Sequence, residues 1–234
     1  MEKKSIVILH GWGLRGSVYK NLVLILKKEG YSVYFPDLPG FGAESLTKDS
    51  MTLDDYVTFL RKFIEKNKLK KPILIGHSFG GRVAIKYAWR NPQHISKLIL
   101  TGVPVIRNTS FRKKIAFLIA VVGGKILKVF NLKIQDIGKK ILYRSISEWD
   151  YYNAGPLRQV FKNIIGEELT GYAKSLKMPV ILVWGKDDRI VPYTDVEKIK
   201  KIISHAQPVV VANTGHRLPY LNSKAFYTAI KNFL

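Results

Sequence analysis

Cysteine is the one residue type whose absence from this chain of 234 residues carries immediate consequences. Without it there are no disulfide bonds, no thiolate nucleophile and no cysteine-bound metal site. A chain free of cysteine is compatible with a reducing compartment, and we expect a cytoplasmic protein. Histidine is scarce, with five residues, so each can be weighed as a candidate base.

Long apolar runs are also lacking. The first apolar segment, Ile6–Leu9, is too short for the core of a signal peptide. No stretch approaches the roughly 18 residues that a membrane-spanning helix needs. A length of 234 residues fits one compact domain that carries an insertion.

Acidic residues are few, since 17 Asp and Glu stand against 39 Lys and Arg, for a formal net charge of +22. The basic residues are spread along the whole chain. Nucleic-acid-binding modules usually concentrate them on one face, so we expect no nucleic-acid partner. Three interpretations of the charge stay open: a lysine-rich solvated surface, attraction of an anionic substrate, and peripheral contact with an anionic membrane.

The segment Pro72–Gly81 carries the strongest chemical signal. Its apolar run Ile73–Ile75 is typical of a strand buried on both faces. Residues 76–80 then form Gly-x-Ser-x-Gly centred on Ser78, followed at once by a helical pattern. A sharp strand-to-helix turn would present the Ser78 hydroxyl at the sheet edge as a nucleophile. The alternative is a serine in an ordinary glycine-rich turn.

Strand and helix patterns alternate over most of the chain. The predicted strands are Ile6–Leu9, Ser32–Pro36, Ile73–Ile75, Ile95–Thr101, Val180–Trp184 and Pro208–Val211. The predicted helices between them include Ser17–Glu29, one that begins near Thr52, and Asp195–Ser204. Strands separated by helices imply right-handed crossovers. The expected fold class is therefore α/β, with a mostly parallel sheet flanked by helices.

This alternation stops between residues 103 and 176. Short helices are predicted there instead, around Phe111–Val122, Lys125–Phe130, Ile134–Leu142 and Pro156–Ile164. We interpret residues 103–176 as a helical cap inserted into a core made of residues 1–102 and 177–234. The apolar run Ile115–Val122 either packs over the active site or contacts anionic lipid.

Reactive residues follow three of the predicted strands, and ligands of parallel sheets bind beyond the carboxyl ends of strands. Ser78 follows one strand, Asp187 and Asp188 follow another, and His216 follows the last. A histidine can take the serine proton near neutral pH, and a carboxylate fixes the histidine tautomer. At this point either aspartate can serve, and Asp195 is a weaker third candidate because it fits the first turn of a helix. The alternative for His216 is a histidine in a surface loop.

The other histidines are placed less favourably. His10 lies in the turn after the first strand. His77 precedes Ser78, so its side chain should point away from that serine. His94 lies near the start of a strand, at the opposite end of the sheet, and His205 ends a helix. Only His216 lies in a loop after the last strand.

Five motifs, in this order, resemble those of the α/β-hydrolase family, in its cap-bearing serine carboxylesterase group. They are His10–Gly13, Asp37–Gly42, Gly76–Gly81, Trp184–Pro192 and Gly215-His216. The resemblance covers essentially the whole chain and extends to pimeloyl-carrier methyl ester esterases and meta-cleavage-product hydrolases. It implies that Asp188 is the acid of the triad. It also implies an oxyanion hole made by the backbone amides of Trp12 and Phe79.

The expected activity is that of a serine hydrolase that cleaves a carboxylic ester through an acyl-enzyme. The alternatives are a carbon–carbon bond hydrolase, a thioesterase or an acyltransferase on the same triad, and a non-catalytic binding protein of this fold. The expected partner is a small-molecule ester with an apolar acyl or an anionic group. We expect no cofactor and no metal, because the sequence has no dinucleotide fingerprint, phosphate loop or metal-ligand cluster.

Overall fold

The computed structural model describes residues 4–106 and 157–234. Three predicted cap helices, Phe111–Val122, Lys125–Phe130 and Ile134–Leu142, lie outside the described residues. The fourth, predicted at Pro156–Ile164, corresponds to helix α7 (Arg158–Gly166).

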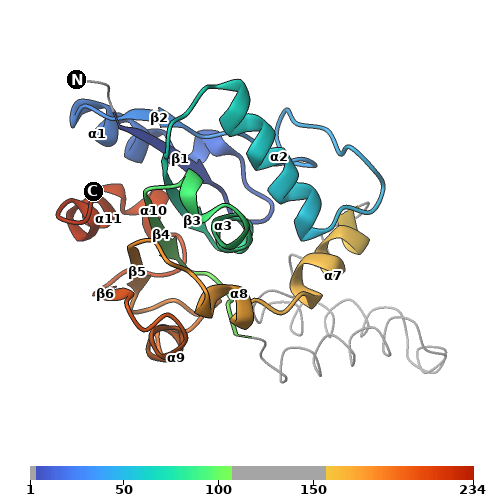
Figure 1. The fold of residues 1–234 in the computed structure, drawn as a ribbon. Coiled ribbons are helices and arrows are strands. Elements are labelled where there is room, and N and C mark those ends of the chain that lie inside the picture. Colours follow the sequence, from blue (N-terminus) through green and yellow to red (C-terminus); the bar gives the residue numbers. More distant parts are fainter. Residues whose placement is uncertain (1–3, 107–156) are drawn as a thin grey trace, which may run out of the picture.

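A six-stranded parallel sheet forms the centre of the fold (Figure 1). In spatial order the strands are β2 (Ser32–Tyr34), β1 (Ser5–Leu9), β3 (Ile73–His77), β4 (Lys97–Thr101), β5 (Val180–Gly185) and β6 (Gln207–Val211). All neighbouring pairs in it are parallel, with His77 beside Thr101 at the carboxyl ends of β3 and β4. The predicted α/β class is confirmed.

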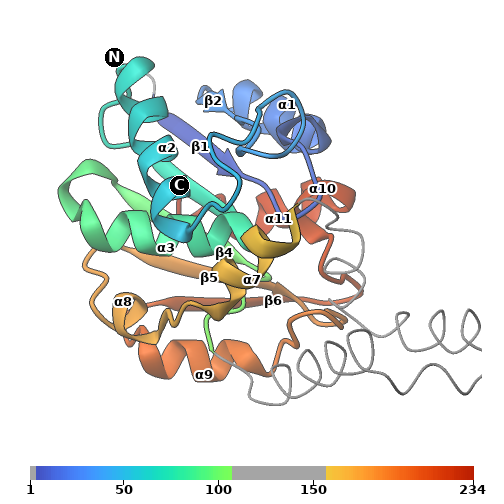
Figure 2. The same cartoon turned by 90° about the vertical axis from the view of Figure 1, so that its right-hand side faces the viewer.

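One face of the sheet packs against helices that follow β2, β3, β4 and β5. Successive strand residues point to opposite faces, and Leu74, Leu98 and Leu182 point into this core. Its helices are α2 (Leu53–Lys66), α3 (Phe79–Arg90), α7, α8 (Thr170–Lys174) and α9 (Asp195–Ile202). Figure 2 shows α3 in front of the strands, between α2 and α9. The short 3-10 helix η2 (Pro92–His94) follows α3.

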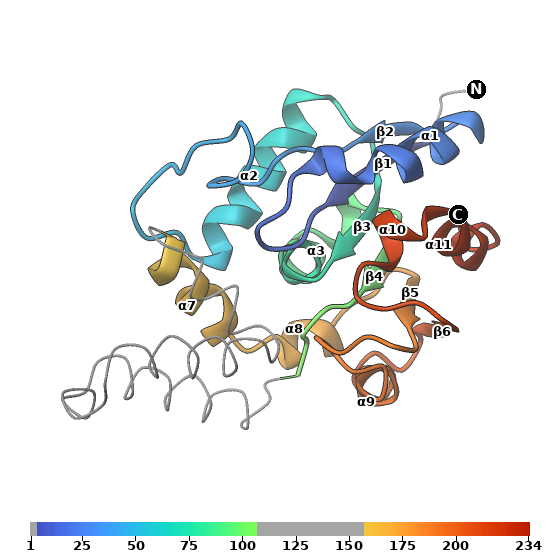
Figure 3. The ribbon, with the colours of Figure 1, turned by 180° about the vertical axis from the view of Figure 1, so that it is seen from behind.

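The other face packs against helices from the two ends of the chain. Ile75, Ile99 and Val183 point into this second core. Its helices are α1 (Lys20–Lys28), α10 (Leu218–Leu221) and α11 (Ser223–Ile230), seen from behind in Figure 3. Each strand is therefore covered from both sides except β6 at the sheet edge, where Val210 is exposed.

The segment Ser17–Glu29, predicted as one helix, divides into two elements. A 3-10 helix, η1 (Gly16–Tyr19), comes first, and α1 follows it. The Gly16 amide donates to Asp37 Oδ1 over 2.7 Å, and a Cβ on Gly16 would lie only 2.0 Å from the carbonyl oxygen of Phe35. This close approach holds the start of η1 against the loop after β2. Tyr19, at the end of η1, is buried.

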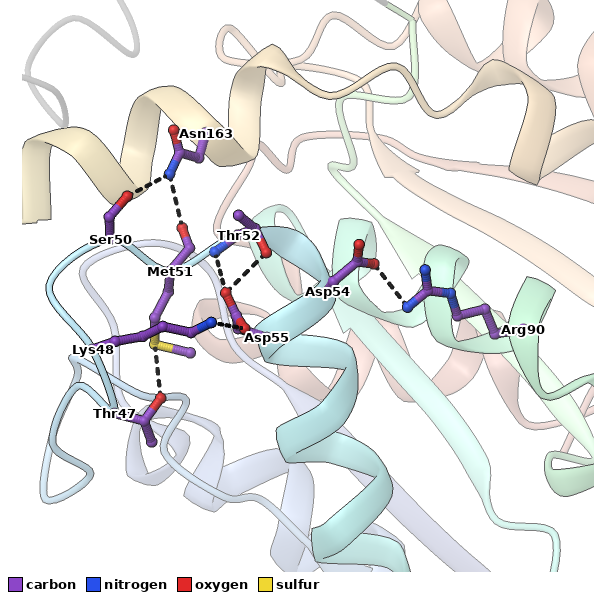
Figure 4. A network of polar contacts seen from close by, with 9 residues as sticks. All are labelled: Thr47, Lys48, Ser50, Met51, Thr52, Asp54, Asp55, Arg90 and Asn163. Atoms are coloured by element: carbon purple, nitrogen blue, oxygen red, sulfur yellow. Dashed lines mark hydrogen bonds and ion pairs between the residues drawn. The ribbon is translucent and has the colours of Figure 1, made fainter.

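The start of α2 is fixed by a polar network (Figure 4). As predicted, the helix begins directly after Thr52: the Asp55 carboxylate accepts the Thr52 amide over 2.7 Å and its hydroxyl over 2.9 Å. Lys48 lies 2.7 Å from Asp55. Asn163 of α7 donates to Ser50 Oγ over 2.9 Å. Helix α7 is thus attached to the loop that leads into α2.

Two buried cations of α3 hold the chain near residues 107–156: Arg82 contacts it on both sides, and Lys86 joins the segment that follows to α2. Arg82 donates to the carbonyl oxygens of Pro104 over 2.5 Å, Ile164 over 2.9 Å and Glu167 over 2.6 Å. Lys86 Nζ lies 2.5 Å from Asp54 Oδ1 and also pairs with the Glu167 carboxylate. Burial opposes the charge of Lys86, but hydrogen bonds to these two carboxylates outweigh burial and raise its pKa.

Within residues 4–106 and 157–234, every helix is too short or too polar to span a lipid bilayer.

Replacing Lys86 with methionine should lower the free energy of unfolding by about 2 kcal/mol, because two partly exposed carboxylates lose their hydrogen bonds to the cation between them. Arg61→Met is the matched control. Its Arg61–Glu65 pair is exposed on α2, with side chains 49% and 58% accessible, so the change should cost less than about 0.5 kcal/mol. Urea titration of both variants measures the difference, and equal losses would contradict a structural role for the Lys86 pairs.

Candidate active site

The polar residues predicted from their positions after strands lie at the carboxyl edge of the sheet. Ser78 follows β3, Asp188 lies in the loop after β5, and His216 lies in the loop after β6. Gly102 follows β4, the strand that lies between β3 and β5 in the sheet. The parallel sheet therefore brings together loops that are far apart in the sequence.

Ser78 occupies a strained turn between β3 and α3. Its φ of +51° and ψ of −113° lie in a region that residues other than glycine rarely adopt. The Ser78 amide donates to the carbonyl oxygen of Thr101 over 2.9 Å. Glycines allow the close packing around it: a Cβ on Gly76 would lie 2.5 Å from the Gly81 Cα. Ser78 itself is half-buried at the sheet edge.

His216 and Asp188 are in direct contact. Nδ1 of His216 lies 2.8 Å from Oδ2 of Asp188, and the two side chains are 12% and 1% accessible. The other carboxylate oxygen, Oδ1, accepts the amides of Ile190 and Val191 over 2.9 Å each. These two bonds fix the carboxylate toward the histidine. Asp187, which the sequence left as an alternative, is exposed.

Gly102 approaches the imidazole closely. Its φ is +59°, and a Cβ built on it would lie 2.7 Å from Cε1 of His216 and 2.8 Å from Nδ1. Glycine is thus required here for backbone conformation and for space. Since Gly102 follows Thr101, whose carbonyl holds the Ser78 amide, β4 links the backbone of the serine to the ring of the histidine.

The two amides expected to form an oxyanion hole flank the serine turn. Phe79 is the first residue of α3, and Trp12 lies in the turn after β1. Neither amide donates to another residue in the described ranges. The Gly80 amide donates to the carbonyl oxygen of His10 over 3.0 Å. This bond ties the first turn to the start of α3.

Aromatic rings line the same region. The Trp12 ring lies edge-on to Phe41, Phe79 and Phe161, with centroids 4.9, 5.5 and 4.8 Å away. Phe161 comes from α7, so α7 reaches the turn after β1. Trp12 is partly exposed, whereas the three phenylalanines are buried.

Two histidines outside the Ser78–Asp188–His216 set are buried beside it. Nε2 of His10 accepts the Leu38 amide over 2.8 Å and so holds the loop after β2. His77 contacts Tyr19 and the backbone of His216. Burial lowers the pKa of both imidazoles. The sequence placed these residues in their turns but gave no signal for these contacts.

His94 and His205 are exposed and lie away from the carboxyl edge of the sheet. In the described residues, no three His, Cys, Asp or Glu side chains gather in a way that could hold a metal ion.

Comparison with known proteins identifies the family. The Hydrolase_4 family, described as serine aminopeptidase, S33, matches residues 1–219. The pimeloyl-[acyl-carrier protein] methyl ester esterase of Wigglesworthia glossinidia brevipalpis is 27% identical over an alignment of 259 positions, which covers 98% of this chain and 93% of that protein.

Solved structures show the same fold. A thermophilic esterase from Thermogutta terrifontis has a TM-score of 0.74 and 20% identity, over 98% of this chain and 89% of its own. The meta-cleavage product hydrolase CumD has a TM-score of 0.70 and 17% identity, over 99% and 91%. The predicted resemblance is confirmed: because the family match spans most of the chain and the fold agrees, this protein belongs to the Hydrolase_4 family and is an α/β-hydrolase.

Proposed function

We propose that this protein is a carboxylic ester hydrolase that uses Ser78 as nucleophile, His216 as base and Asp188 as the acid that orients it. The observation that carries the proposal is the 2.8 Å hydrogen bond between His216 and Asp188, at the sheet edge where Ser78 holds its strained conformation. Relatives named as esterases support the ester as substrate class.

In the proposed reaction Ser78 Oγ attacks the carbonyl carbon of the ester, and its proton passes to Nε2 of His216. Asp188 accepts the hydrogen bond from Nδ1 and stabilises the imidazolium. The carbonyl oxygen takes up negative charge beside the amides of Trp12 and Phe79, which need no reorganisation to receive it. The bond to the alcohol then breaks, and His216 gives its proton to the departing oxygen.

Water completes the cycle. His216 takes a proton from a water molecule, whose oxygen attacks the acyl carbon on Ser78. The second tetrahedral intermediate collapses, the carboxylic acid leaves, and Ser78 regains its proton from His216. Every proton and bond is accounted for by groups of the chain, the ester and water.

The acyl group in this proposal is apolar. Trp12, Phe41, Phe79 and Phe161 form an aromatic cluster around the proposed oxyanion hole, and burying apolar substrate carbon against it is favourable by about 0.8 kcal/mol per methylene. We also propose that the predicted cap, residues 103–176, covers this edge through α7, since Phe161 of α7 contacts the Trp12 ring; α8 of the same segment packs against the sheet. We also propose a cytoplasmic location, because a chain without cysteine is compatible with a reducing compartment.

A second candidate function is hydrolysis of an amide bond, which the family description as a serine aminopeptidase favours. The same three residues would serve, because acyl transfer to serine differs mainly in the leaving group. Thioester cleavage and acyl transfer to another acceptor begin with the same attack by Ser78. Carbon–carbon bond cleavage in addition needs a substrate that stabilises a leaving carbanion. Relative rates on an ester and an anilide separate the ester candidate from the amide candidate.

Replacing Ser78 with alanine should lower kcat for p-nitrophenyl butyrate by about 10⁴-fold or more, because the nucleophile is lost. The wild-type enzyme should hydrolyse this ester with a far higher kcat/KM than an alanine p-nitroanilide. Circular dichroism should show an unchanged fold. If the variant keeps a tenth of the activity, Ser78 is not the nucleophile; a preference for the anilide would establish the amide candidate instead.

The two neighbouring aspartates provide an internal control for the acid. Asp188→Asn should reduce kcat by about 10⁴-fold, because an amide facing Nδ1 favours the wrong imidazole tautomer. Asp187→Asn, at the exposed position, should change kcat less than about threefold. Steady-state kinetics on both variants decide the point, and a larger loss at Asp187 would reverse the assignment.

A side chain at Gly102 should displace the His216 ring. Gly102→Ala is expected to reduce kcat by about 100-fold or more, because a small misplacement of a catalytic group has effects of that size. Gly171→Ala is the control, since a Cβ there meets nothing within 4 Å. Kinetics on both proteins, with thermal melts to check folding, make the comparison. Full activity in Gly102→Ala would mean that the His216 ring tolerates displacement.

A further inference from the structure

The residue before the proposed nucleophile is in contact with the proposed base. His77 ends β3, and the residue is 1% accessible. Both ring nitrogens have partners: Nδ1 lies 2.7 Å from the hydroxyl oxygen of Tyr19, and Nε2 lies 2.9 Å from the backbone carbonyl oxygen of His216. The contact joins residues separated by 139 positions in the chain.

These partners determine which nitrogen carries the proton. A carbonyl oxygen can only accept, so Nε2 of His77 must be the donor to His216. In the neutral ring Nδ1 then has a free lone pair, and the Tyr19 hydroxyl donates to it. Hydrogen bonds thus run in one direction, from Tyr19 through His77 to the His216 backbone.

The surroundings keep this arrangement neutral. Burial lowers the pKa of His77 well below its ordinary value and raises that of Tyr19 well above its own. The titratable groups that face the His77 ring are Tyr19, Tyr220, His10 and His216. Positive charge on His216 or His10 would also oppose a charge on the His77 ring, so the neutral ring is favoured and Nδ1 keeps the lone pair that accepts from Tyr19.

The backbone of His216 lies in the loop between β6 and α10, and its carbonyl oxygen is held there by His77. Asp188 fixes the ring from the Nδ1 side, but a ring pivots about its backbone. The His77 ring packs beside the His216 ring, with centroids 4.9 Å apart. Since His77 is bonded covalently to Ser78, its hydrogen bond sets the position of the base relative to the nucleophile.

We propose that His77, oriented by Tyr19, is a positioning residue that holds the His216 backbone in register with Ser78. This inference rests on the proposed function, in which His216 is the base. Substituting a histidine with a merely structural role would lower stability. Substituting a positioning residue would lower kcat and leave KM unchanged.

Substituting His77 with glutamine or with asparagine tests its two hydrogen bonds one at a time. The nitrogen of glutamine stands at the same number of bonds from the backbone as Nε2, so His77→Gln keeps a donor for the His216 carbonyl. The oxygen of asparagine matches Nδ1, so His77→Asn keeps the acceptor for Tyr19 but has no donor that reaches His216. Both variants lose the ring and bury an amide, and because asparagine is one methylene smaller, their melting temperatures are compared together with kcat.

The experiment measures kcat, KM and melting temperature for these two variants and for Tyr19→Phe with p-nitrophenyl butyrate. We expect His77→Gln to stay within about fivefold of wild type, and His77→Asn to lose 10- to 100-fold in kcat with KM within twofold. Tyr19→Phe should lose about three- to tenfold in kcat. Tyr87→Phe removes a hydroxyl from another buried tyrosine, one without a hydrogen-bond partner in the described residues, and should leave kcat unchanged.

Equal kcat for the glutamine and asparagine variants would overturn the proposal. So would losses in kcat that correlate with the melting temperature and not with the presence of a donor to the His216 carbonyl. If both His77 variants fail to fold, Tyr19→Phe decides: kcat equal to that of Tyr87→Phe overturns the proposal. Labelling of wild type by a fluorophosphonate probe, and its loss in Ser78→Ala, is measured alongside. Failure of that labelling counts against the proposed function itself, whereas retained labelling with equal His77 variants counts only against the role of His77.

Discussion

The strained backbone at Ser78 is the constraint on which the rest of the structure depends. A φ of +51° at a residue with a side chain costs on the order of 1–3 kcal/mol and persists only where surrounding contacts impose it. Here a strand and a helix cross so closely that Gly76 and Gly81 leave no room for a Cβ. The Thr101 carbonyl holds the Ser78 amide from the neighbouring strand. Both cores of the sheet stabilise this crossing, and the strain leaves the Ser78 side chain at the carboxyl edge.

Directional hydrogen bonds then position each group around that turn. One oxygen of the Asp188 carboxylate accepts two backbone amides, and the other contacts His216. The turn after β1 is bonded to α3 through the His10 carbonyl. Because the imidazoles of His10 and His77 are buried, their charged forms are disfavoured. They therefore act as neutral donors and acceptors with fixed tautomers, and the Asp188 carboxylate keeps a buried position beside His216. A buried cation lies elsewhere, on α3, where Lys86 pairs with Asp54 and Glu167.

Much of this arrangement could be predicted from the sequence because strand order dictates it. Ser78, Asp188 and His216 each follow a strand, and the apolar runs located all six strands of the sheet. Contacts between distant segments could not be predicted. No local pattern joins His77 to His216, or Arg82 to the carbonyls of Pro104 and Ile164. The split of the first helix at Tyr19 depends equally on tertiary contacts, because the loop after β2 supplies the partners of Gly16.

The most direct test of the proposed mechanism is the structure of the enzyme after inhibition by an alkyl phosphonate, whose tetrahedral phosphorus mimics the proposed intermediate. The mechanism predicts a covalent bond from Ser78 Oγ to phosphorus. It also predicts a phosphoryl oxygen about 2.7–3.1 Å from the amide nitrogens of both Trp12 and Phe79, with His216 Nε2 facing the serine oxygen. Phosphorus on any other residue, or an oxygen pointing away from these two amides, would contradict it.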